Sequence, residues 1–328
     1  MIHLITTFFL VRRIPGSLLL GVNLSDPLPP QSLTISPQHA TNREEEYAQC
    51  LLRNIQSPLV ASIQLLVQQE EALQLLKKDV LPALISIAGP RAAQKIVPVL
   101  FPGRPEQPLY SDLFEYANHN ALVRGQICCV ANADVYFSDL DTSLVSSSGN
   151  SNVDKKSEQG FRTWMDQFFP PPFPPLNKHG NIPNPTSSNR NSEGVVIGPP
   201  PPRRPTVVMA LTRYESEDGT APLIDNYNGS HDAFVFRSPL VLPSSTTATS
   251  SSSFIHSIAH RQNSYKAENV VIYELQQRGA MVLNPCLDLR MFHLHSADVR
   301  QWMPSVGEGR YSRAAPMTLQ EALRCCSP

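Results

Sequence analysis

Short apolar runs alternate along this chain with segments whose apolar residues recur at helical spacing. The runs contain almost no polar alternation, which indicates strands that are buried on both faces of a sheet. Strands of this kind alternating with amphipathic helices predict an α/β fold built from βαβ units on a mostly parallel central sheet. The predicted strands are residues 2–11, 62–67, 94–101, 127–131, 206–214, 230–236, 280–285 and 289–295, and the predicted helices are residues 42–55, 70–87, 110–117 and 267–278.

One apolar run ends abruptly in polar residues. Residues 127–131 follow Gly125 and lead directly into Asn132, Ala133 and Asp134. In open α/β sheets, ligands bind beyond the carboxyl ends of the strands, so Asn132 and Asp134 are expected at a ligand site. An aspartate there can hold Mg²⁺ or Mn²⁺ together with substrate phosphates. The alternative is an ordinary loop in which Asp134 caps the next turn and Asn132 bonds the backbone.

The pattern predicts one domain over residues 1–300 and a C-terminal tail over residues 301–328. Residues 12–41 are rich in proline and predict an extended loop at the rim of the site. Residues 141–205 are dominated by serine, asparagine and proline. Such a composition buries too little apolar surface to offset the entropy of ordering, which predicts disorder. Residues 243–254 predict a Ser/Thr-rich loop.

Part of the long insertion departs from its surroundings. Phe161, Trp164, Met165, Phe168 and Phe169 are spaced like one or two amphipathic helical turns. We expect these residues to pack on the domain or on a partner. The neighbouring polyproline runs are of the kind that SH3 and WW domains bind.

Composition and charge narrow the classes of function. A formal net charge of -1 argues against nucleic-acid and membrane-surface partners. None of the six cysteines has C-x-x-C spacing, which argues against zinc and thioredoxin-like chemistry and favours a reducing compartment. Residues 2–11 are too short to span a membrane and lack a preceding positive region. We therefore expect a cytoplasmic location, or the secretory pathway if the chain is a fragment.

The order of these parts resembles the GT-A fold of nucleotide-sugar-dependent glycosyltransferases, over residues 2–295 without the Pro- and Ser-rich tracts. Asn132 and Asp134 resemble the D-x-D element, which in that fold follows a central strand and holds Mn²⁺ or Mg²⁺ against the donor diphosphate. Glu268 and Asn269 resemble the later acidic pair that opens the acceptor-side helix.

The closing part of the chain continues the resemblance. Gly279, Pro285 and then His293 or His295 are similar to the family's helix, glycine, proline-containing strand and histidine, and that histidine can complete the metal shell. The resemblance implies a single GT-A-like domain that transfers a sugar from a nucleotide-diphosphate donor to the hydroxyl of a glycan, protein or small-molecule acceptor. It implies Asp134, with His293 or His295, as ligands of Mn²⁺ or Mg²⁺.

The catalytic base is less defined than the metal ligands. Asn269 stands where an aspartate usually acts as base, and a neutral amide cannot accept the acceptor's proton. Asp232 or Glu268 is therefore the expected base, although Asp232 fits a loop aspartate bonded to backbone amides about equally well. Asn132 likewise leaves Asp134 as the one negative residue of its motif, and whether transfer inverts or retains configuration stays open.

Two further residues are predicted from position alone. Arg213, after the strand of residues 206–214, is expected to reach a phosphate, and Thr6 to lie near the nucleotide base. A surface or turn role is their default alternative. Asp139 and Asp141 form a literal D-x-D but rank below Asp134, because they lie past the end of the strand.

Other functions compete with transfer. The two asparagines at acidic positions also fit a GT-A-like domain that has lost catalysis and recruits partners through its polyproline segments. A nucleotidyltransferase would need a Gly-rich basic loop after the first strand, of which Arg12, Arg13 and Gly16 are a faint trace.

Overall fold

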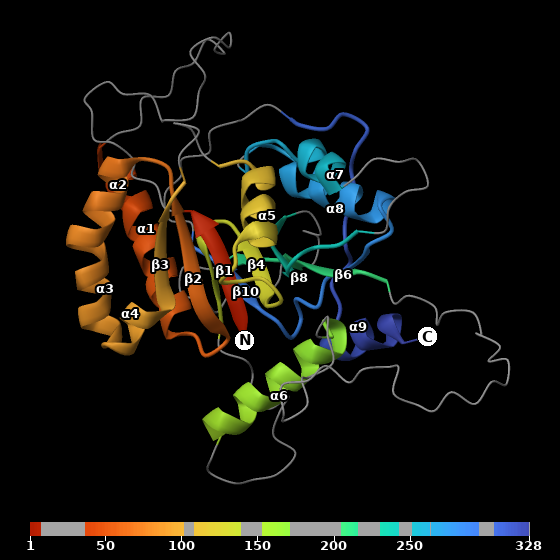
Figure 1. Ribbon diagram of the computed structural model, residues 1–328, viewed down its shortest axis with the longest axis horizontal. Helices are drawn as coiled ribbons and strands as arrows, with labels where there is room; N and C mark the ends of the chain where they lie inside the picture. The colour runs from red at the N-terminus through yellow and green to blue at the C-terminus, as the bar shows by residue number, and fades with distance from the viewer. Residues whose placement is uncertain are drawn as a thin grey trace, which may run out of the picture.

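The centre of the molecule is a seven-stranded sheet in the order β3-β2-β1-β4-β8-β6-β9 (Figure 1). The computed structural model describes residues 1–7, 37–101, 108–138, 153–170, 205–215, 230–242, 251–262, 264–294 and 305–327. All strands run parallel except β8, which is antiparallel to both β4 and β6. The mostly parallel α/β sheet expected from the apolar runs is thus confirmed. The strands are β1 (Ile2–Thr7), β2 (Val60–Val67), β3 (Ile96–Leu100), β4 (Ile127–Ala131), β6 (Val207–Thr212), β8 (His231–Arg237) and β9 (Met281–Leu283).

Helices cover both faces of this sheet, which explains why its strands lack polar alternation. Ile127 and Cys129 of β4 belong to a core that includes residues of α1, α3, α6 and α9, whereas Cys128 and Val130 pack with α5, α7 and α8. Successive side chains of a strand point to opposite faces, so both sets are buried. The helices are α1 (Pro37–Gln56), α2 (Glu70–Leu75), α3 (Leu81–Ala88), α4 (Arg91–Lys95), α5 (Tyr110–His119), α6 (Val153–Phe168), α7 (Ser251–Ser257), α8 (Ala267–Gln277) and α9 (Leu319–Cys326).

A second, three-stranded sheet has the order β5-β10-β7. It consists of β5 (Val135–Phe137), β7 (Tyr214–Glu215) and β10 (Met291–His293), with β10 antiparallel to β5 and parallel to β7. The apolar segment around residues 125–137 therefore forms two strands in two sheets, and Asn132 to Asp134 make the turn between them. The small sheet has a buried aromatic cluster of its own, which contains Tyr136, Tyr214 and Phe292.

Several boundaries differ from the sequence prediction. Helix α1 begins at Pro37 and so includes the last residues of the predicted loop 12–41, of which residues 12–36 lie outside the described chain. The predicted helix 70–87 is present, but a π-helical segment, Leu76–Val80, separates α2 from α3. Pro82 follows it, and a proline removes one helical hydrogen bond and crowds the carbonyl four residues earlier.

The two polar tracts contain structured residues. In the insertion 141–205, α6 buries Phe161, Met165 and Phe168 in the domain core, so the expected amphipathic packing is confirmed and occurs on the domain. Figure 1 shows α6 beside α9, and both contribute to that core. Helix α7 begins within the predicted loop 243–254, because Phe254 is buried against Phe114. Residues 141–152, 171–204 and 243–250 are outside the described parts.

The C-terminal segment crosses the domain rather than trailing from it. Ser305 bridges Tyr265, and Pro316 bridges Asn284. Helix α9 then begins at a capping box, in which Thr318 Oγ1 accepts from the Glu321 amide at 3.2 Å while the Glu321 carboxylate accepts from the Thr318 amide at 2.8 Å. Within the described ranges, no helix is long and apolar enough to cross a membrane.

Candidate functional site

The polar residues after several strands meet at one edge of the large sheet. The strands β1, β4 and β6 run parallel, so their carboxyl ends lie at the same edge, and β8 runs the other way and begins there. This register places Asn132, Arg213 and Asp232 together. The chain passes from β1 to β2 and β3 on one side, then to β4 on the other, so a change of direction falls between β1 and β4. Such points are where open α/β sheets bind ligands.

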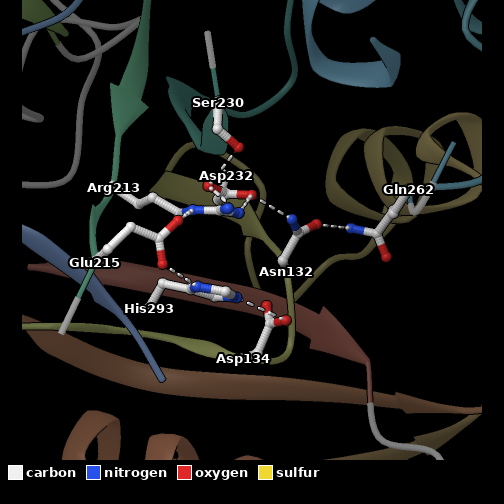
Figure 2. Close-up of polar contacts among 8 residues, drawn as sticks. All are labelled: Asn132, Asp134, Arg213, Glu215, Ser230, Asp232, Gln262 and His293. Carbon is white, nitrogen blue, oxygen red and sulfur yellow. Dashed lines mark hydrogen bonds and ion pairs between the residues drawn. The ribbon is translucent and has the colours of Figure 1, made fainter. Parts of the chain in front are cut away.

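Asp232 is the most heavily bonded side chain at this edge (Figure 2). Arg213 Nη1 lies 3.1 Å from each carboxylate oxygen, and Ser230 Oγ donates to Oδ2 at 3.1 Å. Asn132 Nδ2 donates to Oδ1 at 2.7 Å. Asp232 is 1% exposed, so its charge is offset by Arg213 and by these donors instead of water.

The same contacts explain the amide at position 132. Asn132 Nδ2 donates to Asp232, while Asn132 Oδ1 accepts from Gln262 Nε2 at 3.0 Å. An aspartate at 132 would place a second carboxylate against Asp232 and could not donate, which is unfavourable for two like charges in contact. Asn132 therefore serves as a connector between Asp232 and Gln262.

A second line of contacts runs beside the first (Figure 2). His293 Nε2 lies 3.2 Å from Asp134 Oδ2, and His293 Nδ1 lies 2.8 Å from Glu215 Oε2. Arg213 Nε donates to the other oxygen of Glu215 at 2.6 Å. Glu215 thus joins the two lines, with Arg213 on one side and His293 on the other.

These contacts shift the pKa of both members of the His293–Glu215 pair. Burial lowers the pKa of His293, but the charge and hydrogen bond of Asp134 and the bond to Glu215 outweigh it and raise the pKa to about 9. Burial raises the pKa of Glu215, but His293 and Arg213 outweigh it and lower the pKa to about 2. At neutral pH, His293 is therefore an imidazolium that donates to Asp134 and Glu215 at once.

Glu268, in the first turn of α8, is electrostatically coupled to this cluster. Burial raises its pKa, and the nearby negative charge of Asp232 raises it further. Burial also raises the pKa of Tyr110 well above its usual range, and the next largest contribution comes from Glu268. A carboxyl whose pKa is raised toward neutrality is suited to exchanging protons.

Several buried polar atoms near this edge have no hydrogen-bond partner among the residues that the structure describes. They are Thr6 Oγ1 in β1, Gln68 Nε2 just after β2, Tyr110 Oη at the start of α5 and His231 Nδ1 at the start of β8. The Tyr110 hydroxyl is near enough for Glu268 to affect its pKa, but it makes no hydrogen bond of normal geometry. Because buried polar groups are almost always bonded, Thr6 and Gln68 favour a polar ligand at the ends of β1 and β2.

The protein side chains at this edge supply only part of the coordination shell of a metal ion. Asp134 and His293 are close together, but among the described residues no group of three or more His, Cys, Asp or Glu side chains is arranged to hold an ion. Mg²⁺ and related ions commonly take one or two carboxylates and complete their shell with water and substrate phosphates. The donor set suits that mode and does not suit an all-protein cage.

The structure brings together most of the predicted site residues. Asn132, Asp134, Arg213, Asp232 and His293 form the two contact lines. Glu268 is near enough for the charges of the cluster to shift its pKa, and Thr6 is buried at the end of β1. His295, Asp139 and Asp141 lie outside the described residues.

Sequence reasoning missed Glu215, Ser230, Gln262 and Tyr110. Glu215 had a usable signal, because it is two residues after Arg213 in extended chain and so points to the same side. Ser230 is likewise two residues before Asp232. Gln262 and Tyr110 had none, since their place depends on how distant segments pack.

Asn269 has a structural contact rather than a place in the acidic cluster. Its Nδ2 donates to the Ser312 carbonyl at 2.9 Å, and the Ser312 amide donates to the Asn269 carbonyl at 3.2 Å. An aspartate could not donate to Ser312. Asn269 thereby fastens the C-terminal segment to the start of α8.

No protein-family model matches this chain, and no curated protein or solved structure is significantly similar to it.

Proposed function

We propose that this protein is a GT-A-like glycosyltransferase that moves a sugar from a nucleotide-diphosphate donor to an acceptor hydroxyl. One observation carries the proposal. Asn132 with Asp134, Asp232, Glu268 and His293 come from four distant segments, and they converge at one edge of the sheet. Three of these segments are the motifs on which the sequence resemblance rests, and their convergence supports the proposal.

The donor end of the proposed site lies at the ends of β1 and β2. The buried, unbonded Thr6 Oγ1 and Gln68 Nε2 offer hydrogen bonds to the polar edges of a nucleoside. The diphosphate would then lie toward Asp134. A divalent ion held there by Asp134 would offset negative charge on the leaving diphosphate. His293 would join its shell only as a neutral imidazole, after losing the proton that it donates to Asp134.

We assign the acceptor's proton to Glu268 in preference to Asp232. Both oxygens of Asp232 already accept hydrogen bonds, from Arg213, Ser230 and Asn132. Accepting a proton there would break the ion pair with Arg213, which is buried and costly to disrupt. The raised pKa of Glu268 suits a general base. Asp232 instead positions Arg213 and Asn132 around the donor.

Donor binding gives a direct test. In a thermal-shift assay with Mn²⁺ and a panel of UDP- and GDP-sugars, the correct donor should raise the melting temperature, since saturation at 100 times Kd stabilises by about 2.7 kcal/mol. Asp134→Asn should abolish the shift, and Asp79→Asn, an exposed aspartate on the π-helical segment, should retain it.

The outcomes separate the proposed function from its competitor. If no nucleotide sugar shifts the melting temperature with or without metal, the transferase proposal fails. If a donor binds but no nucleoside diphosphate is released with any acceptor, the chain is a GT-A-like binding protein without turnover.

A further inference from the structure

Two exposed tyrosines and two cations gather beside the start of α8. Lys266 Nζ lies 5.4 Å from the ring centroid of Tyr265 and 5.7 Å from that of Tyr311. The Arg313 guanidinium carbon is 5.1 Å from the Tyr311 centroid, and Arg313 Nε also donates to the Tyr311 hydroxyl. These four residues, Tyr265, Lys266, Tyr311 and Arg313, are called the aromatic–cation patch below.

The patch is exposed and carries uncompensated charge. Tyr265 is 58% exposed and Tyr311 is 39% exposed, and they are the only aromatic residues among the exposed large hydrophobic side chains of the described chain. Neither Lys266 nor Arg313 forms an ion pair with any residue that the structure describes, whereas Arg213 and Arg310 are both paired. Exposed aromatic rings beside cations that lack a carboxylate partner in the described chain mark a surface that is suited to an anionic, ring-containing partner.

The chain holds this patch in place next to the proposed acceptor site. Lys266 is two residues before Glu268, and its φ of 67° is the only positive value of a non-glycine residue in the described ranges. Tyr265 is bridged to Ser305. Ser312, between the other two patch residues, bonds Asn269 through both its amide and its carbonyl.

We propose that the aromatic–cation patch binds the acceptor, and that this acceptor is a saccharide carrying carboxylate or sulfate groups. The tyrosine rings provide flat apolar faces against which the C–H face of a sugar ring can pack. Lys266 and Arg313 provide charge-assisted hydrogen bonds to an acidic substituent. Glu308, an exposed acid on the same segment, forms no ion pair with either cation in the described chain, so the patch keeps an excess of positive charge.

The identity of this acceptor rests on the proposed glycosyltransferase function, but the binding surface can be tested without it. Isothermal titration calorimetry on the full chain, without donor or metal, would compare four probes of similar size. Tetragalacturonate carries carboxylates, chondroitin 4-sulfate tetrasaccharide carries sulfates and carboxylates, maltotetraose is neutral, and a short oligothymidylate is a non-saccharide polyanion with stacking bases.

We expect at least one acidic saccharide to bind about tenfold more tightly than maltotetraose, with an affinity that falls as salt rises. Tyr311→Ala and Lys266→Asn should each weaken that binding by about tenfold. Asparagine tolerates a positive φ, so Lys266→Asn removes the charge while keeping the backbone. Lys78→Asn, at an exposed position on the π-helical segment, and Leu122→Ala, at an exposed position after α5, are the matched controls and should change nothing.

Equal binding of maltotetraose, tighter binding of oligothymidylate, or full binding by both patch variants would overturn the inference. The donor thermal shift, measured on the same variants, separates the two proposals. If a donor shifts the melting temperature but no acidic saccharide binds, the acceptor proposal for the patch fails and the transferase proposal stands. If saccharide binding depends on the patch but no donor shifts the melting temperature, the patch is a saccharide site and the transferase proposal fails.

Discussion

At the scale of residues, the site consists of charges that are balanced against one another in a mostly buried setting. Arg213 and His293 are the two cations, and Asp134, Glu215 and Asp232 are their direct partners. Three carboxylates against two cations give the cluster an excess of negative charge, even without Glu268. A diphosphate would be repelled by that excess, and this is the physical reason that a divalent ion is expected with the donor.

Glu268 can be tested by kinetics. Glu268→Gln should lower the transfer rate by roughly 10²–10⁴-fold, because the amide cannot accept the acceptor's proton. The donor thermal shift should persist, since Glu268 is not assigned to the donor. Glu115→Gln, an exposed carboxyl on α5, is the control and should be fully active.

The pH dependence gives an independent check on Glu268. Burial and Asp232 raise its pKa from the ordinary value of 4.5, and only the carboxylate form can act as base. The transfer rate should therefore rise with pH, and the midpoint of that rise should lie above pH 4.5. A midpoint at the ordinary glutamate pKa, or unchanged turnover in Glu268→Gln, would exclude Glu268 as the base.

At the scale of elements, α6 shows how a proline- and serine-rich insertion can contribute to the core. Phe161, Met165 and Phe168 recur at helical spacing and are buried on the sheet face that α9 also covers. Arg237 of β8 donates to the carbonyls of Phe169 and Gly125, which ties the end of α6 to the start of β4. The insertion is thus anchored at the opposite end of the sheet strands from the site.

Removing one of these contacts should destabilise the whole domain. Met165 is fully buried, so Met165→Ala should lower the free energy of unfolding by about 2–5 kcal/mol. Gln167→Ala, on the exposed side of the same helix, should change it by no more than about 0.5 kcal/mol. Urea denaturation measures both. Equal stability of the two variants would show that α6 is not part of the cooperative core.

At the scale of the whole molecule, the two sheets are joined through ionised side chains. His293 belongs to the small sheet, and Asp134 lies in the turn that follows the large sheet's β4. Their contact spans 159 residues of sequence. One of the contacts that join the sheets therefore depends on the protonation of His293.

This link predicts a pH dependence of stability. The folded-state pKa of His293 is about 9, above the unfolded value of 6.5. Its contribution is fully present below pH 6.5 and is lost as pH rises through 9, and the shift corresponds to at most about 3 kcal/mol. Urea denaturation at pH 6.5 and pH 9.5 should show this fall in the parent chain and a smaller one in His293→Gln. The prediction would be contradicted if the free energy of unfolding fell equally in the parent and in His293→Gln. It would also be contradicted if His256→Gln, at an exposed control site, reduced that fall as much as His293→Gln does.

The sequence by itself determined most of the strands and helices of the large sheet and part of the chemistry. Strand positions followed from apolar runs, and helices such as α8 followed from 3.6-residue spacing, because these patterns arise from local backbone geometry. Asn132 and Asp134 were found as polar residues at the end of an apolar run, Asp232 from its place between two elements, and Glu268 and His293 from the family resemblance. Boundaries shifted where a buried aromatic, such as Phe254 in α7, lay inside a polar tract.

Only the tertiary structure decided the direction of β8, the division of one apolar segment into β4 and β5, and the partners of each charged group. Asn132 meets Asp232 across 100 residues of sequence. Such contacts depend on strand order and register, which are set by the packing of the whole core and leave no periodic signal in the chain. The choice of Glu268 over Asp232 as base follows from these contacts, because it depends on which carboxylate the fold has already bonded.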